Sequence, residues 1–538
     1  MSKKGMVVCP QPEAAESGIE VLRAGGNAVD AAVACALAQT VVDPMMCGIA
    51  GFGVAAVYLP ITATHEYIDF HAPAPIAARP DMWEDLLEGE ARDGFGFSVK
   101  GRVNDIGAQS IAVPAALKGL RRLHERHGKL PWNEVVAPAV QWARQGFFVR
   151  PAMHLFWTDE PLPGRAANRE RLAFSEEGRK LYCRADGSPK AIGTPLINPD
   201  YADTLEQIAR EGDEPFYRGD IAHRMVDHLR AAGGILSLDD LARYEPKIRH
   251  PLKGTYKDRV ITTNQPPGGG AMLIEMLNIL EAAQAGALQH NSPEYIKLVC
   301  EAMKIATADK DKFIGDPDFV DVPLDQILSK TYAAEQAGNI QAGVRATVPR
   351  LNTVVTVPKD TTHLSVVDGE GNCVSLTHSL AMPSGIITPG LGFMYNGCMG
   401  VFDPRPGRAG SIAAGKARFT SSCPTIILKD GRPEIVLGAP GGTQIAMGVL
   451  QALLNVFEFG MDMQQAVSAP RFSSTSDIID VCNRIPRRTT QALESEGYKT
   501  ARNPFGYTIG WVHAIRILDD GALEGGADPG RDGVAYAL

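Results

Sequence analysis

The chain has 538 residues, of which 45% are hydrophobic and 21% are charged, with 53 Lys and Arg against 62 Asp and Glu. This composition excludes a fibrous or disordered protein, and the length allows one large unit or several domains. The formal net charge of -9 gives no basic field for a nucleic-acid backbone, so nucleic-acid binding is disfavoured.

The N-terminal part is predicted to be mainly helical. Apolar residues recur at helical spacing on either side of Gly25, Gly26 and Asn27, which predicts two helices joined by a tight turn. The apolar stretch 28–42 is too short to span a bilayer and contains Asp30 and Gln39, so a buried helix is expected. Further helices are predicted at about 114–126, 132–145 and 292–308, with a Gly/Pro loop at 264–271.

The pattern changes after residue 350. The run TTHLSVVDGEGNCVSLTHSL from residue 361 has two β-prone segments around a DGEGN turn, which predicts a hairpin. Further strands flank the DG pairs in PTIILKDGRPEIVLGAP and YTIGWVHAIRILDDGALEGGADP, with helices between them. Strands with interposed helices indicate a layered α/β or α+β architecture.

The cysteines and the N-terminal segment indicate a cytoplasmic protein. Nine cysteines are scattered without any C-x-x-C pair, which is not the pattern of a disulfide framework or a zinc knuckle. The first residues, MSKKGMVVCPQPEAAES, hold no apolar run of signal-peptide length. We therefore expect neither secretion nor a membrane partner.

Several common catalytic motifs are missing from the sequence. It contains no H-E-x-x-H pair for zinc and no G-x-S-x-G elbow for a serine hydrolase. His363 and His378 lie on the expected hairpin, where a hydrogen-bonding role is the better interpretation. Gly48, Gly51 and Gly53 lack the dinucleotide-binding spacing, and close backbone packing is the better explanation. No cofactor or metal is expected.

The junction of Asp360 and Thr361 is the remaining candidate. A threonine hydroxyl is a weak nucleophile unless a base stands beside it, and an N-terminal threonine has its own α-amine as that base. This amine has an ordinary pKa of roughly 7.7–8.0, which suits proton transfer at cellular pH. The chain must first be cut before Thr361. By itself, however, a Thr-Thr pair before a strand indicates only β-propensity.

The surrounding motifs resemble the γ-glutamyltranspeptidase family of N-terminal nucleophile hydrolases, whose members cleave themselves before such a threonine. The resemblance covers nearly the whole chain, and its ordered blocks are GGNAVDAAVA, IAVPAALKGL, LPWNEVVAPAVQWARQGF, QPPGGGAML, EAMKIATADKDKFIGDPDFVDVP, TTHLSVVDGEGNCVSLTHS, SSCPTIILKDG, GAPGGTQ and GMDMQQAVSAPRF. It implies a four-layer αββα sandwich of the α+β class. It also implies a large fragment, 1–360, and a small fragment, 361–538, that stay associated as a heterodimer after cleavage, with a dimer of these left open.

The resemblance also implies roles for individual residues. Thr361 is the expected nucleophile, and Ser379 stands where the family has a second hydroxyl that bonds to it. Gly441 and Gly442 match the pair whose backbone N–H groups form the oxyanion hole. Thr420 and Ser421 fall near the serine pair that contacts the substrate carboxylate, with a register uncertain by one residue.

Three substrate contacts of the family are altered. His71 stands in DFHAPAP where glutathione-cleaving members have an arginine for the α-carboxylate. A histidine is only partly charged near neutral pH and cannot form two parallel bonds. The segment 396–402 lacks the expected acid for the substrate α-amine, with Asp403 one place out of register, and Ala381 replaces an asparagine.

These departures favour an amidohydrolase whose acyl group lacks the γ-glutamyl amine, such as an oxamate-like or cephalosporin-type substrate, with His71, Thr420 and Ser421 near its carboxylate. A true γ-glutamyltransferase or glutathione hydrolase is the alternative within the family. An uncut, catalytically silent binding protein is the alternative outside it.

Overall fold

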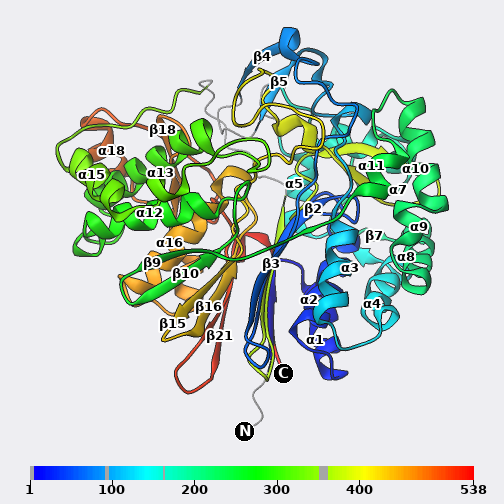
Figure 1. Cartoon of the computed structure of the whole chain (residues 1–538), viewed down its shortest axis with the longest axis horizontal. Helices are drawn as coiled ribbons and strands as arrows, with labels where there is room; N and C mark the ends of the chain where they lie inside the picture. Colours follow the sequence, from blue (N-terminus) through cyan, green and yellow to red (C-terminus); the bar gives the residue numbers. More distant parts are fainter. Residues whose placement is uncertain (1–4, 91–95, 161–163, 351–360) are drawn as a thin grey trace.

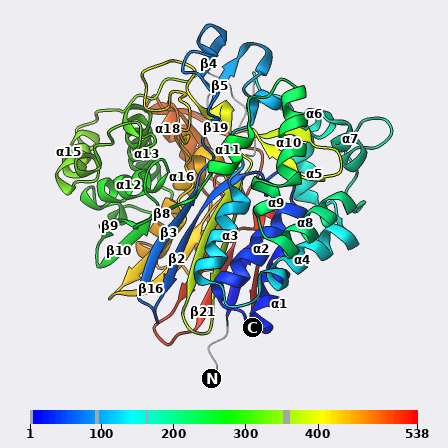
Figure 2. The same ribbon diagram turned by 45° about the vertical axis from the view of Figure 1, so that its right-hand side comes forward.

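The computed structural model describes residues 5–90, 96–160, 164–350 and 361–538. Two antiparallel sheets pack face to face, and helices cover both outer sides (Figures 1 and 2). The first sheet has the order β22 (Val534–Ala537), β1 (Met6–Cys9), β11 (Thr362–Val367), β12 (Cys373–Ser379), β2 (Phe52–Leu59), β3 (Thr64–Phe70) and β8 (Lys247–Arg249). The second has the order β21 (Leu523–Ala527), β20 (His513–Ile517), β16 (Arg432–Gly438), β15 (Thr425–Lys429), β10 (Arg259–Thr263) and β9 (Leu252–Tyr256). The predicted αββα sandwich is confirmed.

The helices agree well with their sequence signals. Gly25, with φ +93°, lies in the predicted turn, and the side chain of Asn27 accepts hydrogen bonds from the first backbone N–H groups of the next helix. The helices of the first layer include α1 (Pro12–Arg23), α2 (Ala28–Val42), α3 (Ala116–His127), α4 (Trp132–Gln145) and α8 (Pro199–Glu211). Those of the second include α12 (Gly270–Ala282), α13 (Pro293–Phe313), α15 (Lys330–Gln341), α16 (Ile445–Phe457), α17 (Met463–Ser468) and α18 (Arg487–Ser495). A lobe beside α8 adds α5 (Pro151–Thr158), α6 (Asn168–Ala173), α7 (Glu176–Tyr182), α9 (Glu214–Tyr217), α10 (Asp220–Ala231) and α11 (Leu238–Arg243).

Both sheets combine strands from before and after residue 360. In the first sheet, β11 pairs with β1 on one side and with β12 on the other, and β12 in turn pairs with β2. In the second sheet, β10 pairs with β15. A cut before Thr361 would therefore leave two chains held together by shared sheets and a shared core, rather than two separate domains.

A polar layer lies between the sheets, beside an apolar cluster that includes Val54, Ile426 and Val436. His363 on β11 contacts the Thr377 hydroxyl through Nδ1 at 2.8 Å and the Ser365 hydroxyl through Nε2 at 3.1 Å. These contacts confirm the predicted hydrogen-bonding role of this histidine.

Acid should destabilise the protein through its buried histidines. Burial lowers the pKa of His378 and of His513 to about 3, and it lowers the pKa of His363 well below its usual range. In the unfolded chain these rings titrate near pH 6.5. Below about pH 6.5 the unfolded state therefore binds more protons than the folded state, whose buried histidines stay neutral. Their contribution to stability is complete above about pH 6.5 and is lost as pH falls, by about 1.4 kcal/mol per pH unit for each histidine. The urea midpoint should therefore fall between about pH 7 and pH 5. An unchanged midpoint would contradict this expectation.

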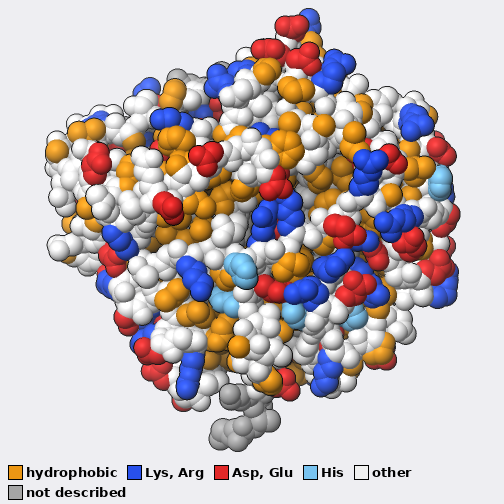
Figure 3. Space-filling model, in the orientation of Figure 1, with side chains coloured by type: hydrophobic (Ala, Val, Ile, Leu, Met, Phe, Trp, Pro, Cys, Tyr) orange, Lys and Arg blue, Asp and Glu red, His pale blue; other side chains and the backbone are white. Residues whose placement is uncertain are grey.

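Other features of the described residues bear on the predictions. No helix in the described ranges has the length and apolar character needed to cross a bilayer. Within the same ranges, His, Cys, Asp and Glu form no cluster suited to a metal ion. The nine cysteines are buried and free. Acidic and basic side chains are interspersed over the face shown in Figure 3.

Candidate active site

Thr361 directly precedes β11, a strand in the middle of the first sheet, and its side chain is buried. Its Oγ1 donates a hydrogen bond to the Ser379 hydroxyl at 3.1 Å. Its φ of +153° is unusual for a β-branched residue, which indicates backbone strain at this position. Asp360, the residue expected on the other side of the cleavage point, lies outside the described residues.

Ser379 ends β12 directly beside Thr361. Its Oγ also accepts a hydrogen bond from the backbone N–H of Ala381 at 2.9 Å, so two groups fix its position. Ala381 has φ +61°, in the left-handed region, which asparagine adopts more readily than alanine. The structure therefore brings together the predicted hydroxyl pair, and it shows that Ala381 contributes its backbone rather than a side chain.

A buried hydrogen-bond network, which the sequence motifs do not indicate, lies next to Thr361. Gln39 of α2 donates from Nε2 to the Thr362 hydroxyl at 3.0 Å and to Gln11 Oε1 at 2.7 Å. Its Oε1 lies 2.8 Å from His378 Nε2. These contacts attach the first residue of β11 to the helical layer, which fixes the strand that begins after Thr361. The sequence signal was a glutamine within an otherwise apolar helix.

The predicted oxyanion glycines form the turn between β16 and α16. Gly441 has φ +141° and Gly442 has φ +54°, and a 3-10 turn, Gly442–Gln444, leads into the helix. A Cβ on Gly438, at the end of β16, would lie 2.3 Å from the His363 ring, so this strand end packs tightly on β11. The glycine turn and Thr361 thus lie at the same end of facing strands.

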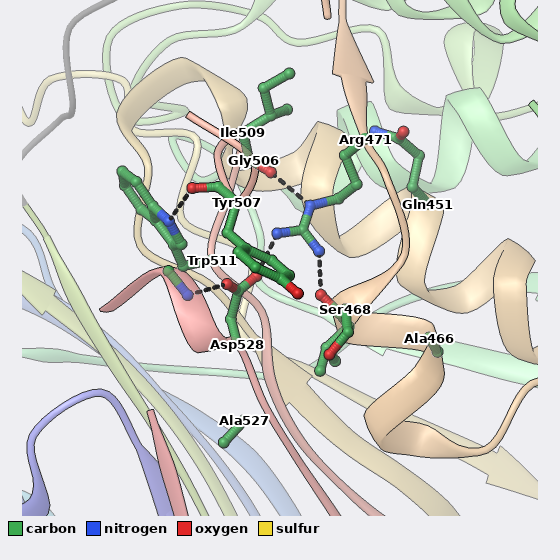
Figure 4. Close-up of polar contacts among 12 residues, drawn as sticks. Gln451, Ala466, Ser468, Arg471, Gly506, Tyr507, Ile509, Trp511, Ala527 and Asp528 are labelled. Carbon is green, nitrogen blue, oxygen red and sulfur yellow. Dashed lines mark hydrogen bonds and ion pairs between the residues drawn. The ribbon is translucent and has the colours of Figure 1, made fainter. Parts of the chain in front are cut away.

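A second loop supports this turn, and Figure 4 shows how it is held. A Cβ on Gly441 would lie 3.0 Å from Gly510 Cα, and the backbone N–H of Trp511 donates to Pro440 O at 3.1 Å. Buried Arg471 donates from Nε to Ile509 O at 2.8 Å and forms an ion pair with Asp528. Arg471 therefore positions the loop against which the glycine turn packs, and no motif in the sequence indicates this role.

Thr420 and Ser421 lie buried beside the Gly/Pro loop. The backbone N–H of Thr420 donates to Pro267 O at 2.9 Å, and its hydroxyl lies 3.0 Å from the Ser422 hydroxyl. A Cβ on Gly269 would lie 2.4 Å from Ser421 O, so a side chain there would collide with this segment. The glycines of this loop therefore allow close approach of the two segments.

His71 follows β3 and lines a cavity of about 350 Å³. Its Nδ1 contacts the Asp69 carboxylate, while its buried Nε2 has no hydrogen-bond partner among the described residues. Burial raises the pKa of Asp69, but the contact with His71 outweighs this and leaves the pKa below its ordinary value. The lining includes Tyr244, Pro267 and Ala417, but none of Thr361, Ser379 and the two predicted oxyanion glycines.

The segment expected to carry an acid for a substrate amine contains a 3-10 turn, Cys398–Val401, without an acidic residue. Asp403, the neighbouring acid, contacts Arg405 through both carboxylate oxygens at 2.7 Å. It is therefore already paired within its own loop.

Similarity to known proteins covers nearly the full chain. The sequence model of the family described as Gamma-glutamyltranspeptidase matches residues 14–538. The chain is 38% identical to "Acylase ACY 1 proenzyme" of Pseudomonas sp. (strain V22), over 99% of this chain and 94% of the relative. It is 31% identical to "Glutathione hydrolase proenzyme" of Pseudomonas aeruginosa, with the same two coverages. The crystal structure of cephalosporin acylase from Bacillus halodurans superposes with a TM-score of 0.87 at 28% identity, over 99% of this chain and 96% of that one.

Proposed function

The chain belongs to the γ-glutamyltranspeptidase family of N-terminal nucleophile hydrolases, and we propose that Thr361 is the nucleophile with which it cleaves itself and then hydrolyses a small amide. One observation carries this proposal: the Thr361 hydroxyl donates a hydrogen bond to the Ser379 hydroxyl. This pair lies at the strand end that faces the Gly441 turn. In self-cleavage, Thr361 Oγ attacks the Asp360 carbonyl carbon and the C–N bond breaks. Water then hydrolyses the resulting ester, which frees the Thr361 hydroxyl and α-amine.

Substrate turnover would repeat the same chemistry on an external amide. The α-amine of Thr361 takes the hydroxyl proton and passes it to the leaving amine, and water releases the acyl group from the ester. The backbone N–H groups of Gly441 and Gly442 stabilise the oxyanion, and loss of one such donor costs roughly 3–4 kcal/mol of barrier. Each step uses groups of this chain and water.

We further propose an acyl group that has a carboxylate but no α-amine. The support is the lack of an acid in the 3-10 turn Cys398–Val401, the pairing of Asp403 with Arg405, and the likeness to proteins named acylases. Thr420 and Ser421 would contact the substrate from their buried segment, and His71 would offer Nε2 as one hydrogen-bonding group. The alternative is a glutathione hydrolase, favoured by the relatives that bear that name.

The large and small fragments would remain one heterodimer after the cut, because both sheets contain strands from each fragment. The nine free cysteines fit a reducing compartment, which supports a cytoplasmic location.

The mass of the purified wild-type protein tests the proposal. Denaturing electrophoresis and intact-mass measurement should give two fragments, 1–360 and 361–538, that co-purify under native conditions. A single uncut chain without amidase activity would contradict the proposal and favour a silent binding protein.

A further inference from the structure

We propose that Arg418 supplies the positive charge that holds the free carboxylate of the acyl group, so that the substrates are monoamides of short dicarboxylic acids. This inference rests on the proposed function of Thr361. Arg418 directly follows Ala417, which lines the cavity beside His71, and precedes the Thr420 segment by two positions. Its side chain is buried, with the residue only 2% exposed.

A short series of contacts connects Arg418 with the nucleophile. Its guanidinium carbon lies 4.3 Å from the centre of the Phe52 ring. Phe52 begins β2 and is the direct cross-strand partner of Ser379, which accepts the hydrogen bond from Thr361. Side chains of directly opposed residues share one face of a sheet, with Cβ atoms about 4.5–5.5 Å apart. The Phe52 ring therefore lies on the same face of the sheet as the Ser379 hydroxyl, and the guanidinium stacks against that ring.

The surroundings of Arg418 suit an anion and oppose an ammonium group. Its Nη1 donates to Phe419 O at 2.8 Å. Burial raises the pKa of the Cys398 thiol, and the guanidinium lies close enough to that thiol to offset part of this rise. Cys398 opens the 3-10 turn in which an acid for the substrate amine was expected. A guanidinium remains charged and can grip a carboxylate with two parallel bonds. A cation therefore stands beside the turn where an amine-binding site would need an anion.

His71 is less suited to the same task. Its ring packs on Phe52 with the ring centres 6.1 Å apart, but its Nδ1 is bound to Asp69. Any carboxylate brought to this ring would meet the Asp69 charge at short range, which is unfavourable in a buried site. His71 thus keeps a hydrogen-bonding role, while Arg418 provides the charge that the family arginine provides elsewhere.

Three substrates test the inference on the wild-type processed enzyme. They are glutaryl nitroanilide, the methyl ester of glutaryl nitroanilide, and γ-glutamyl nitroanilide. Glutaryl nitroanilide should have a kcat/KM about 100-fold above the methyl ester, mainly through KM, because the ester removes the charge but keeps the chain length. The γ-glutamyl compound should be poorer than the glutaryl compound, because its ammonium group approaches the Arg418 cation. Equal turnover of the glutaryl compound and its ester would overturn the inference.

Variants identify the residue responsible. Arg418→Met should lower kcat/KM for glutaryl nitroanilide about 100-fold and leave the methyl ester within about threefold. The kcat/KM of Arg418→Lys for glutaryl nitroanilide should lie between those of Arg418→Met and wild type. Lysine keeps the positive charge but lacks the paired N–H donors of the guanidinium. Arg345→Met is the matched control, because Arg345 also stacks on an aromatic ring, at 4.1 Å from the Tyr498 centre, but away from Thr361.

Self-cleavage of each variant shows that it has folded. If Arg418→Met does not cleave itself, the inference is tested by two other measurements. These are the ratio of glutaryl to methyl ester turnover in the wild-type enzyme and the same ratio in Arg418→Lys. An unchanged ratio of glutaryl to ester turnover in a processed Arg418 variant would overturn this inference but leave Thr361 as the nucleophile. A processed wild-type enzyme that hydrolyses none of the anilides would instead count against the proposed function.

Discussion

Replacement of Thr361 by alanine should leave the chain uncut and reduce amide hydrolysis by about 10⁴-fold or more, because no other group can form the ester. Intact mass and nitroanilide turnover would measure the two losses. Thr361→Ser should retain both activities in part, since it keeps the hydroxyl that contacts Ser379.

Thr362→Ala is the matched control for this prediction. The Thr362 hydroxyl bonds to Gln39 and Gln11 on the helical side of the strand, not to Ser379. Its loss should cost roughly 1–2 kcal/mol of stability while self-cleavage continues. A Thr361→Ala protein that still yields fragments 1–360 and 361–538 would refute the role assigned to Thr361.

Gly441→Ala should reduce kcat by about 10²- to 10³-fold, the range observed when one oxyanion donor is lost. The new Cβ would lie 3.0 Å from Gly510 Cα, and φ +141° is a conformation that alanine rarely adopts. Both effects would move the backbone N–H groups away from the oxyanion. Steady-state kinetics of the processed variant, with its melting temperature, would measure the change.

Gly460→Ala separates backbone strain from catalysis. Gly460 has φ +63°, and a Cβ there would meet no atom within 4 Å. This variant should lose roughly 1–2 kcal/mol of stability without a loss of kcat. If Gly441→Ala kept kcat within twofold of wild type, the glycine turn would not be the oxyanion hole.

Local features of the fold could be predicted from the sequence better than long-range ones. The turn at Gly25–Asn27 and the start of α4 at Trp132 carry their own signals, through glycine conformation and helix-start residues, and the structure confirms them. The close packing predicted for Gly51 is also confirmed, because a Cβ there would lie 2.3 Å from Ser379 O. The strand β3 was not marked, since its segment THEYIDF also carries polar residues.

The chemistry of the site was partly open to sequence reasoning. Thr361, Ser379 and the glycine pair could be proposed because motif positions transfer along a chain of similar length, and these roles stay predictions. Gln39, Phe52 and Arg471 could not, because each acts through a partner far away in sequence. An arginine at position 418 carries no motif, and its nearness to Ser379 becomes visible through Phe52, which contacts both.

By itself, the sequence of this protein determined its family, its αββα class and the expected division at Thr361, because these follow from ordered motifs and local propensity. Only the tertiary structure decided which charged side chains lie near the hydroxyl pair of Thr361 and Ser379. His71, where the resemblance implies an arginine, is bound to Asp69, whereas Arg418, from another segment, stacks on Phe52, the cross-strand partner of Ser379. The physical reason is that motif spacing records chain position, whereas a buried charge acts through distance and through the groups packed around it.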